Sequence, residues 1–240
     1  MQVKRFQVGF KLLLTNCYLV ADEETSNAVV IDPGFREGQE LDILREISDR
    51  NLRVKYVINT HGHPDHVSGN DIIKQATNSL ILIHEKDAKW LTNPSSSYAE
   101  AMIKAGLSIE KPDFPCLECG KDALRWEFHN DVEKMILECG ACNFFQEYRS
   151  LSPPDILLNH GDIIKIGRLE LRVIHNPGHS EGTIVLYIEG KNTIFGRPAD
   201  VPLIPELSEL PDPTIVYPGH GERTTIGKIK REKQQSSAGG

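Results

Sequence analysis

The chain has 240 residues, a length that fits one large α/β domain or one domain carrying a small insertion. Hydrophobic residues make up 39% and charged residues 25%, which is typical of a folded globular protein rather than a disordered one. The formal net charge of −7 argues against nucleic acid as a partner, because binding phosphates needs a basic face. No apolar run reaches the about 18 residues of a membrane span, and the first ten residues lack a signal-peptide core, so we expect a cytoplasmic protein without membrane contacts.

Short β-rich runs alternate with stretches of helically spaced apolar residues along the first part of the chain. We predict strands at 3–10, 16–20, 27–31, 54–58 and 80–83, and helices at 38–50, 71–75, 85–91 and 98–107. Strands return at 162–166, 169–174, 183–188, 193–195 and 214–217, and a helix is expected at 224–230. Residues 198–213 contain five prolines, which predicts an irregular loop.

Two CxxC pairs, Cys116/Cys119 and Cys139/Cys142, lie in a segment with little helical periodicity. The pairs are separated by 139 − 119 − 1 = 19 residues, the spacing of a zinc ribbon. Four thiolates close a tetrahedron around one ion, so we expect a structural Zn²⁺ site, although thiolates also accept iron. A reducing compartment and the pairing of two motifs disfavour the alternatives, two disulfides or a redox-active CxxC.

Histidines follow three separate predicted strands. His61, His63, Asp65 and His66 stand in the string THGHPDH directly after strand 54–58, whereas His179 and His220 each follow a Pro-Gly turn at a later strand end. Open α/β sheets present ligands at the ends of their strands, and imidazole and carboxylate groups suit Zn²⁺ and tolerate iron or manganese. We therefore expect a site for two metals on one rim of a sheet rather than a polar turn with chance histidines.

The motifs HxHxDH, PGHS-x-GT and PGHG resemble those of the metallo-β-lactamase-like hydrolase superfamily, especially its small members related to glyoxalase II. The resemblance covers residues 1–110 and 155–230 and implies an αββα sandwich of the α/β (α+β) class. It implies that His61, His63 and His179 hold the first metal and that Asp65, His66 and His220 hold the second. A zinc-bound hydroxide would then attack a thioester or ester, with Asp65 orienting it.

The expected organisation has four parts. Residues 1–112 and 148–230 form the two halves of the metallo-hydrolase domain, residues 113–147 form the inserted zinc ribbon, and residues 231–240 form a disordered tail. The ribbon either covers the active-site edge or contacts another protein. One Zn²⁺ is expected at the cysteines and one or two metal ions, Zn²⁺ or iron, at the histidines.

One position departs from the pattern of the family. Relatives carry a metal-bridging aspartate after the strand that corresponds to 193–195, but here Arg197 follows Gly196, and Asp200 is the nearest carboxylate. Asp200 is therefore a candidate bridging ligand, and its alternative is a surface position. Two functions remain open: a hydrolase of a small thioester or ester, and a zinc-binding interaction protein with a weakened catalytic site. An iron-dependent dioxygenase is disfavoured, because it needs the same aspartate.

Overall fold

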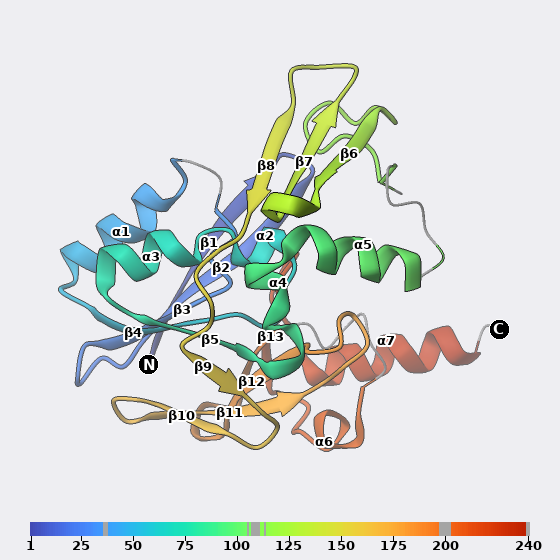
Figure 1. Ribbon diagram of the computed structural model, residues 1–240. Coiled ribbons are helices and arrows are strands. Elements are labelled where there is room, and N and C mark those ends of the chain that lie inside the picture. The colour runs from blue at the N-terminus through green and yellow to red at the C-terminus, as the bar shows by residue number, and fades with distance from the viewer. Residues whose placement is uncertain (36–37, 105, 107–110, 113, 197–202, 239–240) are drawn as a thin grey trace.

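Two six-stranded sheets packed face to face form the body of the protein (Figure 1). The computed structural model describes residues 1–35, 38–104, 106, 111–112, 114–196 and 203–238. Apolar side chains from the facing sides of the two sheets interlock between them, among them Tyr18, Val20 and Ile58 from the first sheet and Leu171, Leu186 and Phe195 from the second.

The first sheet has a parallel half that directs several strand ends to one edge. Its order is β1-β2-β3-β4-β5-β9, with β1 (Gln2–Phe10), β2 (Leu13–Ala21), β3 (Asn27–Ile31), β4 (Arg53–Ile58), β5 (Leu80–His84) and β9 (Ile156–Leu158). Strands β1, β2 and β3 pair antiparallel, whereas β3, β4, β5 and β9 run parallel. Residues that follow β3, β4 and β5 therefore emerge at one edge, where β2 also begins.

The second sheet brings further strand ends to an edge. Its order is β10-β11-β12-β13-β14-β15, with β10 (Ile163–Ile166), β11 (Leu169–His175), β12 (Ile184–Ile188), β13 (Thr193–Gly196), β14 (Ile215–Tyr217) and β15 (Thr224–Thr225). Because β12 is antiparallel to both β11 and β13, and β14 is parallel to β13, the ends of β11, β13 and β14 share one edge. The N–H of Ile184 donates to the Thr60 carbonyl oxygen at 2.8 Å and joins this edge to that of the first sheet.

Helices cover both outer faces, so the expected αββα sandwich is confirmed. On the first sheet, α1 (Glu40–Asp49) and α3 (Asn70–Thr77) pack Ile43, Ile47 and Ile73 against the strands. On the second, α6 (Pro205–Ser208) and α7 (Ile226–Ala238) contribute Leu207, Ile226 and Ile229. None of the described helices combines the length and the apolar character that crossing a lipid bilayer requires.

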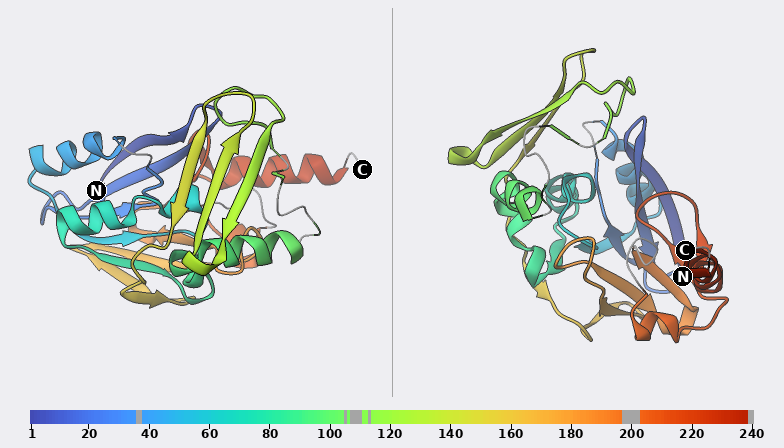
Figure 2. Two further views of the ribbon diagram at one scale, coloured as in Figure 1. Left: turned by 45° about the horizontal axis from the view of Figure 1, so that its top comes forward. Right: turned by 90° about the vertical axis from the view of Figure 1, so that its right-hand side faces the viewer.

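A third, separate sheet of three strands carries most of the cysteine segment. Strands β6 (Leu124–His129), β7 (Lys134–Cys139) and β8 (Phe145–Arg149) form an antiparallel meander that projects from the two large sheets in Figure 1 and in the right-hand view of Figure 2. Leu124 and Trp126 point inward while Arg125 and Glu127 point outward, the period of two expected of a strand with one buried face. These three strands were not predicted.

Several predicted elements differ from the structure. The irregular loop expected at 198–213 contains the helical turn α6 (Pro205–Ser208), and strands β9 and β15 were not predicted. The helix expected at 98–107 is α5 (Pro94–Lys104), which begins earlier because Pro94 is favourable in the first turn of a helix. The chain also continues as α7 through Ala238, into the range 231–240 that was expected to be disordered. Lysine, arginine, glutamate and glutamine dominate this stretch and have high helix propensity, which accounts for the extension.

Asp22 joins the two sheets at the end of β2 that lies away from the strand ends described above. Its carboxylate accepts hydrogen bonds from Thr25 Oγ1 at 2.7 Å and from the N–H of Arg168, in the turn between β10 and β11, at 2.9 Å. Gly167 allows this contact, because it has a φ of +61° and a Cβ there would lie 2.1 Å from Asp22 Oδ2. These hydrogen bonds hold the pKa of Asp22 below its usual value.

Replacing Asp22 with asparagine is expected to lower the free energy of unfolding by about 1 kcal/mol and Tm by about 2–4 °C at neutral pH. Since the folded-state pKa is depressed, this stabilisation is present above the pKa of the unfolded chain and is lost as the pH falls through the folded value. Thermal unfolding of both proteins between pH 7 and pH 3 checks this. A difference in Tm that stays constant over this range would contradict the assignment.

Candidate metal centre

His61 and His63 lie in the loop that follows β4. The intervening Gly62 has no positive φ; a side chain is excluded there because a Cβ would lie 2.5 Å from Cβ of Trp90. The N–H of Gly62 donates to Asp87 Oδ2 at 2.8 Å, which fixes the loop from the other side. The two imidazole rings are thereby held with their centroids 4.6 Å apart.

Asp65 and His66 lie on the single helical turn α2 (Pro64–Val67). Pro64 opens this turn, a position where its missing N–H costs nothing. Gly34 makes room for the turn, because a Cβ at that position would lie 1.5 Å from the carbonyl oxygen of Asp65. The redirection of the chain at Pro64 therefore separates Asp65 and His66 from the first two histidines.

His179 comes from the second sheet, in the loop between β11 and β12. Ser180 closes this loop, since its N–H donates to Thr183 Oγ1 at 2.9 Å and its hydroxyl donates to Asp87 Oδ2 at 2.6 Å. The ring of His179 lies 4.7 Å from that of His61 and 4.4 Å from that of His63, measured between centroids. Three side chains from two sheets thus meet at one point.

His220 is held against the start of β2. Its Nδ1 lies 2.9 Å from the carbonyl oxygen of Leu14. Because a carbonyl only accepts, Nδ1 carries the proton and the lone pair of Nε2 is directed toward the site. The hydroxyl of Tyr18 donates to the Pro218 carbonyl at 2.7 Å and anchors the same loop.

The six side chains form two groups of three potential metal ligands. His61, His63 and His179 form the first group, and Asp65, His66 and His220 form the second; within each group the donor atoms lie within 4.8 Å of one another. The two groups are adjacent, since the ring centroids of His61 and His66 lie 4.1 Å apart. The structure therefore brings together, in the same two sets, the side chains that the family resemblance implies for each metal.

The second group has the dimensions of a metal site. His66 Nε2 lies 3.1 Å from His220 Nε2, and Asp65 Oδ2 lies 3.4 and 3.3 Å from these two nitrogens. Ligands about 2.0–2.1 Å from a tetrahedral ion are separated by about 3.3–3.4 Å. Three donors at these separations leave one position of a tetrahedron for a water or substrate, as in catalytic rather than structural zinc sites.

Asp32 was not predicted and orients His66. Its Oδ1 accepts from the N–H of Thr60 and its Oδ2 from the Thr60 hydroxyl, both at 2.7 Å, while His66 Nδ1 lies 3.0 Å from Oδ2. A carboxylate attracts Nδ1 when this atom carries the proton, which leaves Nε2 for a metal. Asp32 follows β3 directly, so its place at a strand end was the available signal.

Asp65 has an electrostatic environment that favours its charged form. Burial alone would raise the pKa of Asp65, but the imidazoles of His66 and His220 outweigh burial and hold it well below its usual value. The hydroxyl of Thr15, at the start of β2, also donates to Asp65 Oδ2 at 3.0 Å. The side chain is therefore a fixed carboxylate, which is the form that binds a cation.

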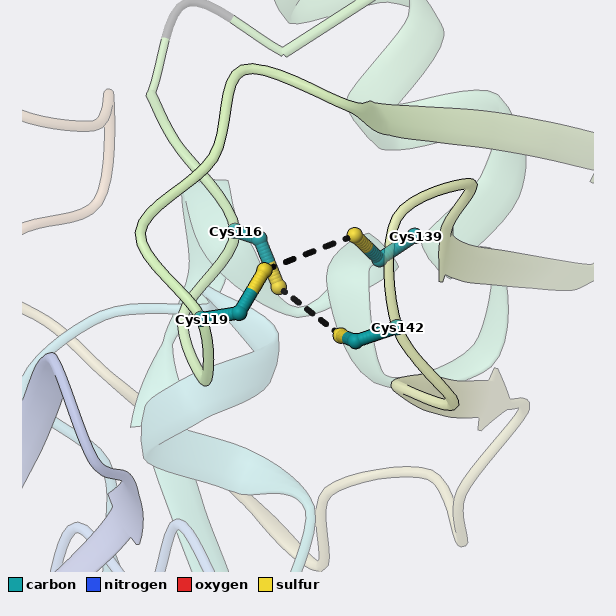
Figure 3. Close-up of side chains that lie close together, drawn as sticks. All are labelled: Cys116, Cys119, Cys139 and Cys142. Carbon is teal, nitrogen blue, oxygen red and sulfur yellow. Dashed lines mark hydrogen bonds between the residues drawn. The ribbon is translucent and has the colours of Figure 1, made fainter.

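The four cysteines meet between the turn that precedes β6 and the turn that joins β7 to β8 (Figure 3). Sγ of Cys116 lies 3.7 Å from that of Cys142, and Sγ of Cys119 lies 3.9 Å from that of Cys139. A tetrahedral ion with metal–sulfur bonds of about 2.3 Å requires sulfur atoms about 3.8 Å apart, whereas a disulfide requires about 2.0 Å. Burial alone would raise the pKa of Cys116, but N–H groups of Cys119 and Glu118 lower it, which favours the thiolate form that binds a metal.

The cysteine-bearing sheet packs against the β1–β2 hairpin and α5. Phe144 contacts Phe10 at the tip of the β1–β2 hairpin, with ring centroids 5.2 Å apart, and Trp126 contacts Tyr98 of α5 at 4.7 Å. Glu133 accepts from the hydroxyl and the N–H of Ser96 in the first turn of α5. Helix α5 in turn lines a cavity of about 330 Å³ whose wall includes His63 and His179.

The candidate bridging ligand Asp200, and Arg197, lie outside the residues that the structure describes. Gly196, which precedes them, has a φ of +125°, and a Cβ there would lie 2.9 Å from the Ile184 carbonyl oxygen. Asp200 therefore remains a prediction from the sequence.

Comparison with known proteins gives one family and several relatives. A family model described as the metallo-beta-lactamase superfamily matches residues 11–196. A hydroxyacylglutathione hydrolase of Haemophilus influenzae is 27% identical over 236 residues, which cover 90% of each protein. The crystal structure of BLEG-1 B3 metallo-beta-lactamase has a TM-score of 0.67 at 21% identity and covers 96% of this chain and 97% of its own; TTHA1623 in a di-iron-bound form has a TM-score of 0.60 at 23% identity, covering 94% and 97%.

Proposed function

Because the chain belongs to the metallo-β-lactamase superfamily, we propose that it is a metal-dependent hydrolase of a small thioester or ester. The observation that carries this proposal is the pair of adjoining three-donor groups, each with the residue types of an open metal site, beside a cavity. The hydroxyacylglutathione hydrolase among its relatives supports a thioester as the substrate class. Six side chains would hold the metals: His61, His63, Asp65, His66, His179 and His220.

A zinc ion held there would supply hydroxide at neutral pH, because zinc lowers the pKa of bound water to about 7, and it would polarise a substrate carbonyl. The chain's own contribution is to hold the reactants. Asp65, which Thr15 fixes, would accept a hydrogen bond from the attacking water and orient it. No serine or cysteine nucleophile is needed.

The cavity of about 330 Å³ is the proposed substrate site. Trp90, Ala101 and Pro177 supply an apolar wall next to His63 and His179, which would hold an acyl group and exclude water. Its volume is near the lower end of the about 300–1,000 Å³ found for small-molecule sites, which favours a compact acyl group.

The metal content is also part of the proposal. We expect one zinc ion at the four cysteines and one or two metal ions at the histidines, where iron is an alternative because one structural neighbour is a di-iron form. We also propose a cytoplasmic location, where thiols stay reduced and can bind a metal. The four-cysteine sheet remains a candidate surface for contact with another protein.

A panel of small thioesters, esters, lactones and β-lactams, assayed with and without chelator, tests the function. We expect turnover of at least one thioester or ester that chelator abolishes and added zinc or iron restores. Absence of chelator-sensitive turnover across the panel would count against a hydrolase.

The second candidate is a zinc-stabilised interaction protein with a weakened catalytic site. It is favoured by Arg197, which stands where relatives carry the bridging aspartate. About one metal per chain, lost with the cysteines and unaffected by His61→Ala, would support this function instead.

A further inference from the structure

Asp87 is a buried carboxylate that lies between the two loops of the first histidine group. It belongs to the short 3-10 turn η1 (Glu85–Asp87) after β5, and its side chain is inaccessible to solvent. Its Oδ2 accepts from the N–H of Gly62 at 2.8 Å and from the Ser180 hydroxyl at 2.6 Å, and its Oδ1 accepts from the N–H of Gly182 at 2.7 Å. One carboxylate therefore holds the His61–His63 loop of the first sheet and the His179 loop of the second.

The packing around Asp87 leaves little freedom to either loop. An added Cβ at Gly182 would lie 2.7 Å from the carboxyl carbon of Asp87, and one at Gly62 would clash with Trp90, three residues further along the same segment. Residues 87–90 therefore contact both loops closely. A shift of Asp87 would have to move Gly62, Gly182 or both.

The hydrogen-bonding chemistry calls for a carboxylate at this position. Three donors approach two oxygens, and an ionised carboxylate accepts on both while offering no donor of its own. Burial raises the pKa of Asp87, while the hydrogen bonds from Ser180, Gly62 and Gly182 act in the opposite direction. An amide of the same shape would place an NH₂ group against the N–H of either Gly62 or Gly182.

We propose that Asp87 is a positioning residue that sets the distance of His61 and His63 from His179, so that the three imidazoles form a site for the first metal before it binds. The inference rests on the proposed function for the identity of that site. Asp87 has no place among the six ligands and acts through the loops that carry three of them. Residues that hold ligands in place affect metal affinity by about 10- to 100-fold when replaced.

The test compares Asp87→Asn with Asp22→Asn, a matched control. Asp22 is also a buried carboxylate that joins the two sheets, but it lies at the opposite end of β2, about 20 Å from Thr15 by the rise of a strand. Each purified protein, with zinc in the cysteine site, is titrated with Co²⁺ in competition with a chelator, and the visible spectrum of the bound Co²⁺ is recorded.

We expect Asp87→Asn to weaken Co²⁺ binding by about 10- to 100-fold and to change its spectrum, while Asp22→Asn lowers Tm with wild-type affinity and spectrum. Wild-type affinity and spectrum in Asp87→Asn would overturn the inference. If that variant does not fold, Ser180→Ala removes one donor and keeps both backbone bonds; a smaller loss of affinity is expected, and none would overturn the inference. Because these readouts measure metal binding, they stay separate from the turnover that tests the proposed function.

Discussion

Replacing His61 with alanine is expected to lower kcat/KM by about a thousandfold for a substrate that the protein hydrolyses. His61 is fully buried and its ring lies beside those of His63, His66 and His179, so its loss removes a donor from the centre of the site. A metal ion that polarises the substrate and supplies hydroxide is worth several kcal/mol to the transition state, and each 1.4 kcal/mol corresponds to a factor of ten. Steady-state kinetics with element analysis of the same preparation measures this.

His160→Ala is the matched control, because His160 is an exposed histidine outside both groups. The control should keep wild-type turnover and metal content. His61→Ala should keep the metal of the four-cysteine site while losing metal at the histidines. Equal turnover in the two variants would contradict the role assigned to His61.

The Cys139→Ser/Cys142→Ser variant is expected to unfold the three-stranded sheet while leaving the sandwich folded. A structural zinc in a small module contributes on the order of 10 kcal/mol to its folding, and a module of this size has little core of its own. Amide hydrogen exchange should therefore become fast in β6, β7 and β8 and stay slow in β3 and β4. Since Glu133 holds the first turn of α5, which lines the cavity, KM should rise more than kcat falls.

Cys17→Ala is the control for this variant, because Cys17 is a buried cysteine in the core of the first sheet. Cys17→Ala should lower the free energy of unfolding and leave the metal content of the four-cysteine site and of the histidine site unchanged. Slow exchange of β6–β8 in the double variant, without metal at the cysteines, would show that the sheet does not depend on an ion.

The proximity of the candidate metal ligands could be expected from the sequence because they are concentrated in short motifs at strand ends. The motifs THGHPDH, PGHS and PGHG each follow a β-rich run. Because the ends of parallel strands lie at one edge of a sheet, residues that follow such strands come close together. The cysteine spacing likewise predicted one four-thiolate cluster, and the four Sγ atoms do lie together. In both cases a few residue types in a fixed pattern carried the signal.

Residues that act through hydrogen bonds at long sequence separation could not be predicted. Asp87 lies 25 residues from Gly62 and 93 from Ser180, and nothing in the string HEKDA distinguishes its carboxylate from that of a surface residue. The strands of the cysteine sheet were missed for another reason. In β6, apolar and charged residues alternate from Leu124 to Phe128, as expected of a strand. The cysteine motifs on either side instead led to the prediction of a metal-bound module without strands.

Element-specific anomalous diffraction from crystals of the purified full chain tests the central claim most directly, namely that imidazoles from three distant segments share metal ions at one sheet edge. We expect a peak about 2.0–2.1 Å from nitrogen atoms of His61, His63 and His179, with or without a second beside Asp65, His66 and His220, and a separate peak among the four cysteines. A peak at the cysteines with none at the histidines, in protein supplied with zinc and iron, would contradict the account.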